Sequence, residues 1–201
     1  MPADGRPTLG TEAVDTLSKE PTGNADVDRV LARLDAVGGE TFTADYVITR
    51  KLGPVERAAT VVSQPPRTTV RVGDVALYDD DNPDQTCDLS AGTCEDGLLD
   101  QRISDLGVSA RFYGPAPAQQ LRVAVARESS TPTVDTTQVA GIGADCLHVP
   151  VGGGIETYCV TGNGLVALLD TAAVHIELTA LTPEVDPSAF DRPAQASTTT
   201  S

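Results

Sequence analysis

The side chains best suited to chemistry in this chain of 201 residues are its four cysteines. They form two close pairs, Cys87 with Cys94 and Cys146 with Cys159, spaced as C-x6-C and C-x12-C. Four cysteines that bind a metal usually include a C-x2–4-C spacing, which this chain lacks. Of the three possible pairings we favour the local one. Two local disulfides in turn indicate an oxidising compartment outside the cytoplasm.

The turn chemistry between the second pair predicts the same pairing independently. A tight turn at Gly152-Gly153 places Cys146 opposite Cys159 on two antiparallel strands. Counted outward from the turn, this pair falls at a non-hydrogen-bonded position. Strand Cα atoms approach there to roughly 4.5 Å, which is within disulfide reach.

The two histidines, His148 and His175, are the remaining candidates for catalysis or metal binding. Strand alternation puts both on the polar face of the hairpins, three strand spacings or roughly 14 Å apart, too far to share a metal. No G-x-S-x-G motif is present, and the glycines at 152–154 lack the strand-then-helix context of a phosphate loop. We predict no catalytic residues, no metal ligands and no cofactor, and therefore a protein that is not an enzyme. A secreted hydrolase would instead need carboxylates or histidines converging in a pocket.

An acidic segment, DDDNPDQTCDLSAGTCEDG at residues 79–97, surrounds the first cysteine pair. Clustered carboxylates could bind calcium. Pro83, however, breaks the D-x-[DN]-x-[DN]-G pattern, and no glutamate stands where a bidentate ligand is expected. We predict a solvated loop stiffened by the Cys87–Cys94 disulfide, and the sequence leaves calcium binding open.

Composition excludes several classes of partner. The chain has 14 Lys and Arg against 29 Asp and Glu, a net charge of −15. This acidity opposes binding to nucleic acid and electrostatic adhesion to anionic lipid headgroups. No stretch approaches the ~20 apolar residues of a membrane span. No signal peptide follows Met1. We therefore expect that an export signal, and with it the anchor that attaches the protein to a membrane, has been removed.

Residues 145–181 predict three consecutive β-hairpins, and they organise the rest of the chain. The turns are Gly152-Gly153, Asn163-Gly164 and a weaker one at Thr171-Ala172, which would set Leu169 opposite Val174. Because side chains alternate along a strand, one face is apolar with Glu156 as its single charge, and the other is polar with the cysteines and histidines.

The remaining elements follow from hydrophobic periodicity. Asn24 can cap a helix that continues to Val37. The other expected elements are strands at 41–51, 56–63 and 67–78 with a turn at Gly73-Asp74, a helix at 98–113, a strand at 119–128, a loop at 129–137 and a closing segment at 183–194 around Phe190. We predict a flexible tether at 1–23, a single domain at 24–194 and a disordered tail at 195–201.

This order of elements predicts an α+β fold with a curved, mostly antiparallel sheet and helices on one face. Together with FTADYVITR after the first helix and PSAFDRPA after the last strand, it resembles the LolA/LppX/LprG-like lipoprotein superfamily. The resemblance covers roughly residues 24–194. It implies an incomplete β-barrel whose concave apolar face is covered by helices, with a cavity for acyl chains between them.

The resemblance further implies an extracytoplasmic protein, secreted or in the cell envelope, that binds or carries a lipid or an acylated molecule. We expect it to be a monomer. The expected ligand-binding residues are Tyr46, Ile48, Leu147, Val149, Tyr158, Val160, Leu165, Leu169, Val174, Ile176 and Leu178, with the two tyrosine hydroxyls at the rim. The alternative is a module with a filled core, which would present the acidic segment 79–97 to a protein partner in the envelope.

Overall fold

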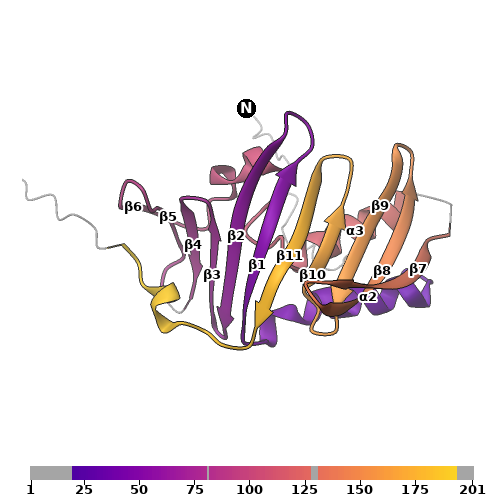
Figure 1. Cartoon of the computed structure of the whole chain (residues 1–201), viewed down its shortest axis with the longest axis horizontal. Coiled ribbons are helices and arrows are strands. Elements are labelled where there is room, and N and C mark those ends of the chain that lie inside the picture. The colour runs from indigo at the N-terminus through magenta and orange to yellow at the C-terminus, as the bar shows by residue number, and fades with distance from the viewer. Residues whose placement is uncertain (1–19, 81, 128–130, 194–201) are drawn as a thin grey trace, which may run out of the picture.

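The computed structural model describes residues 20–80, 82–127 and 131–193. Most of the expected tether, residues 1–19, and the expected tail, residues 195–201, lie outside these ranges. Within them, eleven strands form one antiparallel sheet in the order β6-β5-β4-β3-β2-β1-β11-β10-β9-β8-β7. The sheet is open, because its end strands β6 and β7 do not pair with each other. Helices α2 and α3 lie on the same side of it (Figure 1), so the expected α+β class is present.

The strands are β1 Phe42–Arg50, β2 Val55–Gln64, β3 Arg67–Val72, β4 Val75–Asp79, β5 Gln85–Asp88, β6 Thr93–Asp96, β7 Thr133–Val139, β8 Ile142–Val151, β9 Gly154–Thr161, β10 Val166–Asp170 and β11 Val174–Thr182. The α-helices are α2 Ala25–Ala36 and α3 Pro115–Arg127. The short 3-10 helices are η1 Val37–Gly39, η2 Asp100–Arg102, η3 Ser104–Leu106 and η4 Pro187–Phe190.

Helix α2 begins where its sequence predicts. The Asn24 side chain accepts hydrogen bonds from the backbone N–H groups of Asp26 and Val27, which no residue within the helix could satisfy. Its apolar stripe is buried against the sheet: Val27, Val30, Leu31 and Leu34. The helix is therefore held by packing as well as by its cap.

The three hairpins form strands β8 to β11. The β8–β9 register is as predicted, and the β9–β10 register is as predicted from Leu168 onward, after an irregularity that sets Val166 opposite Val160. Cys146 pairs with Cys159, and Leu169 pairs with Tyr158 as the Asn163-Gly164 turn requires. The third register is wrong by two residues, because Leu169 pairs with Ile176. The turn lies one residue later than expected, and the Thr171 hydroxyl accepts hydrogen bonds from the backbone N–H groups of Ala173 and Val174. An error of two residues keeps every side chain on its predicted face.

The acidic segment 79–97 is not the long loop that we expected. Residues of β5 and β6 form a hairpin that extends the sheet, with Cys87 directly opposite Cys94. The disulfide was predicted correctly, but its cysteines belong to paired strands. The sequence shows no alternation of apolar and polar residues there, because most side chains of this short edge hairpin are polar on both faces.

The expected helix at 98–113 is absent; we call these residues the cover segment. It contains only the two short turns η2 and η3, and Gly107 interrupts it with a φ of +77°. The Asp100 carboxylate accepts a hydrogen bond of 2.6 Å from the N–H of Ala110, which closes the segment into a compact loop. Its apolar residues are buried in the core nonetheless: Ile103, Leu106, Ala110 and Phe112.

The expected strand at 119–128 is also wrong, since residues 115–127 form helix α3. Its buried residues Pro117, Ala118 and Leu121 follow helical spacing, whereas Val123, which we had placed beside Leu121, is 46% exposed. The alternation of Leu121, Val123 and Val125 concealed a run of strong helix formers that begins after Pro115.

Strand β7 replaces most of the loop expected at 129–137. It pairs with β8 along its whole length, and the β7–β8 hairpin bends across the face of the sheet that looks away from the helices (Figure 1). Val139 at the end of β7 is buried, and β7 contacts β11 although three strands separate them in the sheet. This bend covers a second, smaller apolar layer on the outer face.

After β11, the closing segment crosses the outer face at the β3–β4 end of the sheet. Phe190 of η4 is buried, and the guanidinium of Arg67 lies 4.3 Å from its ring centre. The Tyr78 hydroxyl donates a hydrogen bond of 3.1 Å to the Asp191 carbonyl. Phe190 therefore covers an end of the sheet, as its isolation in the sequence suggested.

Candidate functional site

The helix-covered face of the sheet carries a continuous apolar row. Pairing places Leu147, Tyr158, Leu169, Ile176 and Ile48 side by side on β8, β9, β10, β11 and β1. The face therefore crosses the four consecutive strands β8 to β11 and continues onto β1, which is remote in sequence. It is the face on which we expected a ligand.

Helices and cover segment fill most of the space above this row. The sequence-predicted ligand-binding residues share one cluster with the buried side chains of α2, α3 and the cover segment. Each of them is no more than 3% exposed: Tyr46, Ile48, Leu147, Val149, Tyr158, Val160, Leu165, Leu169, Val174, Ile176 and Leu178. The structure thus brings the predicted residues together, under a cover.

Tyr46 and Tyr158 are not at a rim, contrary to expectation. They are 1% and 2% exposed. The Tyr46 ring packs edge-on against Phe112 at 5.2 Å, and its hydroxyl has no hydrogen-bond partner among the described residues. The Tyr158 hydroxyl donates to the Glu156 carboxylate at 2.7 Å. Burial raises the pKa of both phenols far above the ordinary value, and for Tyr158 the hydrogen bond and charge of Glu156 add to this.

Glu156 is not the single charge on this face. Asp145 pairs with Val160 and faces α2, where the Arg33 guanidinium donates to its carboxylate at 2.7 Å. The turn after β9 lies directly against the same helix residue, because a Cβ at Gly164 would stand 2.1 Å from the Arg33 carbonyl oxygen. This ion pair and the turn fix α2 to the β8–β9 end of the sheet.

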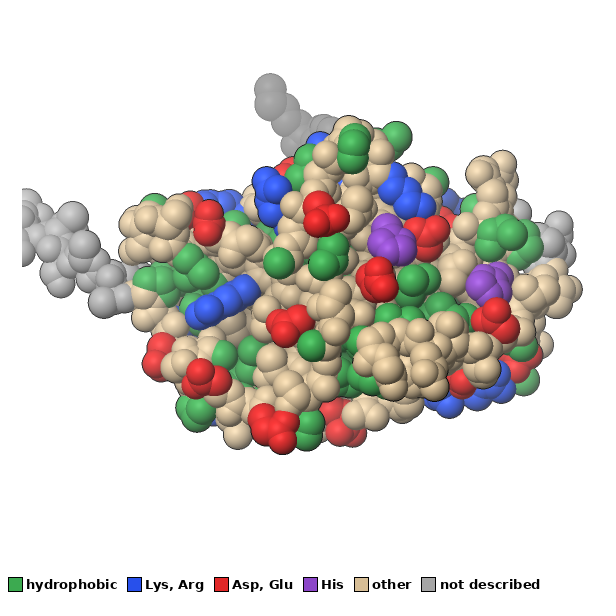
Figure 2. Space-filling view, viewed as in Figure 1, with side chains coloured by type: hydrophobic (Ala, Val, Ile, Leu, Met, Phe, Trp, Pro, Cys, Tyr) green, Lys and Arg blue, Asp and Glu red, His purple; other side chains and the backbone are tan. Residues whose placement is uncertain are grey.

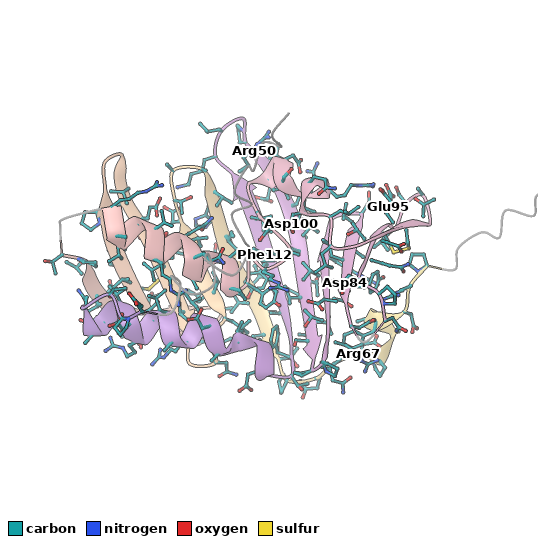
Figure 3. All side chains as sticks on the ribbon, turned by 180° about the vertical axis from the view of Figure 1, so that it is seen from behind. Arg50, Arg67, Asp84, Glu95, Asp100 and Phe112 are labelled. Atoms are coloured by element: carbon teal, nitrogen blue, oxygen red, sulfur yellow. A yellow bond between two sulfur atoms is a disulfide. The ribbon has the colours of Figure 1, made fainter. Side chains whose placement is uncertain are left out.

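A cleft opens into the covered space above β10 and β11. Its volume is about 270 Å³, and we call it the β10–β11 cleft. Its floor is Leu169, Val174 and Ile176 of the sheet. Its walls are Ser104, Gly107, Val108, Ser109 and Phe112 of the cover segment and Ala116, Pro117 and Gln120 of α3. Figure 3, seen from the helix-covered side, shows Phe112 near the middle of the sheet.

The sequence missed the walls of this cleft. We had assigned the cover segment to a regular helix and α3 to a strand, so neither could be placed over β10 and β11. The pattern that could have found α3 is its run of Ala, Gln, Leu and Arg after Pro115. Apart from Gly107, no residue pattern in the cover segment indicates that its backbone is irregular.

The histidines lie on the opposite, outer face, as predicted (Figure 2). His148 is 3.0 Å from the Thr157 hydroxyl and 3.3 Å from the Asp135 carboxylate. His175 Nδ1 is 2.8 Å from the Asp170 carboxylate, which Lys51 also contacts at 2.8 Å. Partial burial opposes ionisation of Asp170, but the hydrogen bonds from Lys51 and His175 lower its pKa overall.

Within residues 20–80, 82–127 and 131–193, no three His, Cys, Asp or Glu side chains are grouped so as to hold an ion. The hairpin carboxylates of Asp88 on β5 and Glu95 on β6 both form ion pairs with Arg102 of η2. Cys87, Cys146 and Cys159 are all buried, and Cys94 alone among the four cysteines is partly exposed. In the same part of the chain, no helix is long and apolar enough to cross a membrane.

These features define an α+β protein built on an open antiparallel half-barrel with its apolar face under helices. No protein-family model and no curated protein matches the sequence. Among solved structures, MucB aligns over 82% of this chain with 18% identity and a TM-score of 0.53. The aligned part is 61% of the MucB chain, so this chain spans less than two thirds of MucB. At that identity the likeness is one of fold.

Two further solved structures align over most of this chain. LprF from Mycobacterium bovis gives 14% identity and a TM-score of 0.44 over 85% of this chain and 98% of its own. A LolA superfamily protein from Nitrosomonas europaea gives 9% identity and a TM-score of 0.41 over 81% of this chain and 95% of its own.

Proposed function

We propose that this chain is a non-enzymatic, extracytoplasmic binding protein that holds an acyl chain of a lipid or an acylated molecule between its sheet and its helices. The observation that carries this proposal is the β10–β11 cleft, which reaches the predicted apolar row at Leu169, Val174 and Ile176. Concave sites with mostly apolar walls are typical of such ligands. The two disulfides support a location outside the cytoplasm.

The cleft, at about 270 Å³, is slightly smaller than ligand sites commonly are, at roughly 300–1,000 Å³. A longer acyl chain therefore requires the cover to move. The cover segment is suited to this, because it is held by short i to i+3 turns and contains Gly107 in the left-handed region. Its outward movement would open the space above Tyr46, whose hydroxyl then gains access to a polar group of the ligand.

Native mass spectrometry of protein purified from its own host tests the proposal. We expect a co-purifying lipid or acylated molecule on the wild type and loss of it in Ala116→Phe, which fills the cleft from its α3 wall. Val123→Phe adds the same ring to the exposed side of α3 and should retain the ligand. A wild type without ligand, or equal occupancy in both variants, would contradict the proposal.

A protein partner in the envelope is the second candidate, and the filled core favours it. With every predicted ligand-binding residue buried, the fold needs no ligand to complete its core. MucB, whose fold is similar, is described in a complex with MucA. The β5–β6 hairpin offers exposed carboxylates at Glu95 and Asp96. Envelope pull-downs with Glu95→Lys and Asp96→Lys should then lose one partner that Glu184→Lys, far from the hairpin, retains.

A further inference from the structure

Three hairpin turns lie on one edge of the sheet (Figure 1). They are residues 51–54 between β1 and β2, residues 171–173 between β10 and β11, and residues 152–155 at the start of β9; together we call them the hairpin rim. The strand order places them two strand spacings apart. From the first to the third turn the rim therefore spans four spacings, roughly 19 Å.

The rim exposes two large apolar side chains that the fold does not use. Leu52 is 75% exposed and Ile155 is 63% exposed, the two highest values among the large apolar residues of the described part. The middle turn adds exposed Ala172 and Ala173. Hydrophobic side chains are visible at the top of the molecule in Figure 2. Two prominent apolar groups on separate turns do not form the contiguous patch that a protein interface requires.

The charges beside the first turn are mixed: Arg50, Lys51 and Arg57 lie near the acidic residues Glu56, Asp105 and Asp170. The net charge is −15, yet Arg50 and Arg57 lie at and just behind the first turn. The Arg50 guanidinium donates to the carbonyls of Gly53 and Asp105, and that of Arg57 donates to the Glu56 carbonyl. Among the described residues, no carboxylate is within ion-pair distance of either. Both cations thus remain available to phosphate groups.

The rim is also joined to the β10–β11 cleft. Arg50 bonds to Asp105 of the cover segment, and the Lys51 N–H donates to the Ala173 carbonyl in the next turn. Val174, the first residue of β11, lines the cleft immediately below that turn. The rim is therefore next to the cleft and is hydrogen-bonded to the cover segment.

We infer that the hairpin rim docks on the surface of a lipid bilayer, with Leu52 and Ile155 inserted into the interface and Arg50 and Arg57 at the phosphate level. This inference rests on the proposed function, because it identifies the bilayer as the source or destination of the acyl ligand. Insertion of apolar side chains supplies the affinity. The acidity of the whole chain favours zwitterionic over anionic lipids.

Sedimentation with phosphatidylcholine vesicles tests the inference. We expect the wild type to bind, and Leu52→Glu with Ile155→Glu to bind about a hundredfold more weakly, since each buried side chain contributes roughly tenfold. The matched control is Val123→Glu with Val134→Glu, which changes two other exposed apolar residues, 46% and 45% exposed, away from the rim. The control should bind like the wild type, and phosphatidylglycerol vesicles should bind less than phosphatidylcholine.

A second readout does not depend on loss of binding. The chain contains no Trp, so Leu52→Trp places a unique fluorophore on the rim. Its emission should shift to the blue when phosphatidylcholine vesicles are added, whereas that of Val134→Trp should not. A wild type that ignores vesicles, equal loss in rim and control variants, or no shift from Leu52→Trp would overturn the inference. Ligand occupancy in native mass spectrometry tests the proposed function separately, because vesicle binding needs no bound ligand.

Discussion

Tyr46 and Tyr158 are both buried under the helices, but only one of their hydroxyls has a partner. Removing a hydroxyl that lacks a partner removes a desolvation cost, whereas removing a donor from Glu156 leaves a half-buried carboxylate unsatisfied. We expect Tyr46→Phe to keep or raise the free energy of unfolding by up to about 1 kcal/mol, and Tyr158→Phe to lower it by about 1–2 kcal/mol. Urea unfolding of both variants measures this. A large loss in Tyr46→Phe would show that its hydroxyl has a partner, such as a buried water.

Gly164 carries two constraints that no other residue could meet. Its φ is +87°, and a Cβ would lie 2.1 Å from the Arg33 carbonyl oxygen of α2. Gly164→Ala should lower the free energy of unfolding by about 2–4 kcal/mol through backbone strain and overpacking. Gly162, two residues earlier, has open space around its Cβ position and an ordinary φ. Gly162→Ala should therefore stay within about 0.5 kcal/mol of wild type, and equal effects in thermal unfolding would contradict this account.

At the scale of elements, the sequence was informative where turn residues and alternation agree. The Gly152-Gly153 turn and the C-x12-C spacing specified the β8–β9 register, and Asn163-Gly164 specified β9–β10. Thr171 displaced the third turn through its own hydrogen bonds, which the preference for glycine in turns does not describe. The predicted β10–β11 register was wrong by two residues. Because two is an even number, Ile176 still lies on the face that was predicted for it.

The sequence failed where tertiary packing decides the local structure. In α3 a period of two in Leu121, Val123 and Val125 competes with strong helix propensity, and only the sheet beneath selects Leu121 for burial. In the cover segment, Leu99, Ile103 and Leu106 have helical spacing, yet Gly107 and the Asp100–Ala110 hydrogen bond produce a loop. Because the cleft walls come from these two elements, the apolar row was predictable and the opening above it was not.

The two disulfides differ in the access of solvent to one of their sulfur atoms. Cys94 is partly exposed on edge strand β6, although Cys87 is buried, whereas Cys146 and Cys159 are both buried. Thiol exchange requires a thiolate to reach a sulfur atom. With limiting dithiothreitol under native conditions, iodoacetamide should label Cys87 and Cys94 before the other pair, as measured by peptide mass mapping. Simultaneous labelling of all four cysteines would contradict this difference in access.

At the scale of the whole molecule, the sheet and its cover differ in how they are held. Strands β1 and β11 lie in the middle of the sheet with ladder hydrogen bonds on both sides. The cover segment has no ladder: it is held by local turns, a few side-chain bonds, apolar contacts and one backbone hydrogen bond to the sheet, from the Val166 N–H to the Tyr113 carbonyl. Opening free energies rise with buried contacts and protected hydrogen bonds. The cover should therefore open without unfolding of the sheet.

Hydrogen–deuterium exchange measures this difference directly. Amides at 99–113 should exchange at least tenfold faster than those of β1 and β11, because fewer long-range contacts must break to expose them. A bound acyl ligand would stabilise the open cover, so its addition should change exchange at 99–113 and in the facing part of α3 while β3 and β4 stay constant. Uniform exchange across sheet and cover would mean that the two open as one unit. The apolar row would then be a structural core, and the protein partner would become the better account of function.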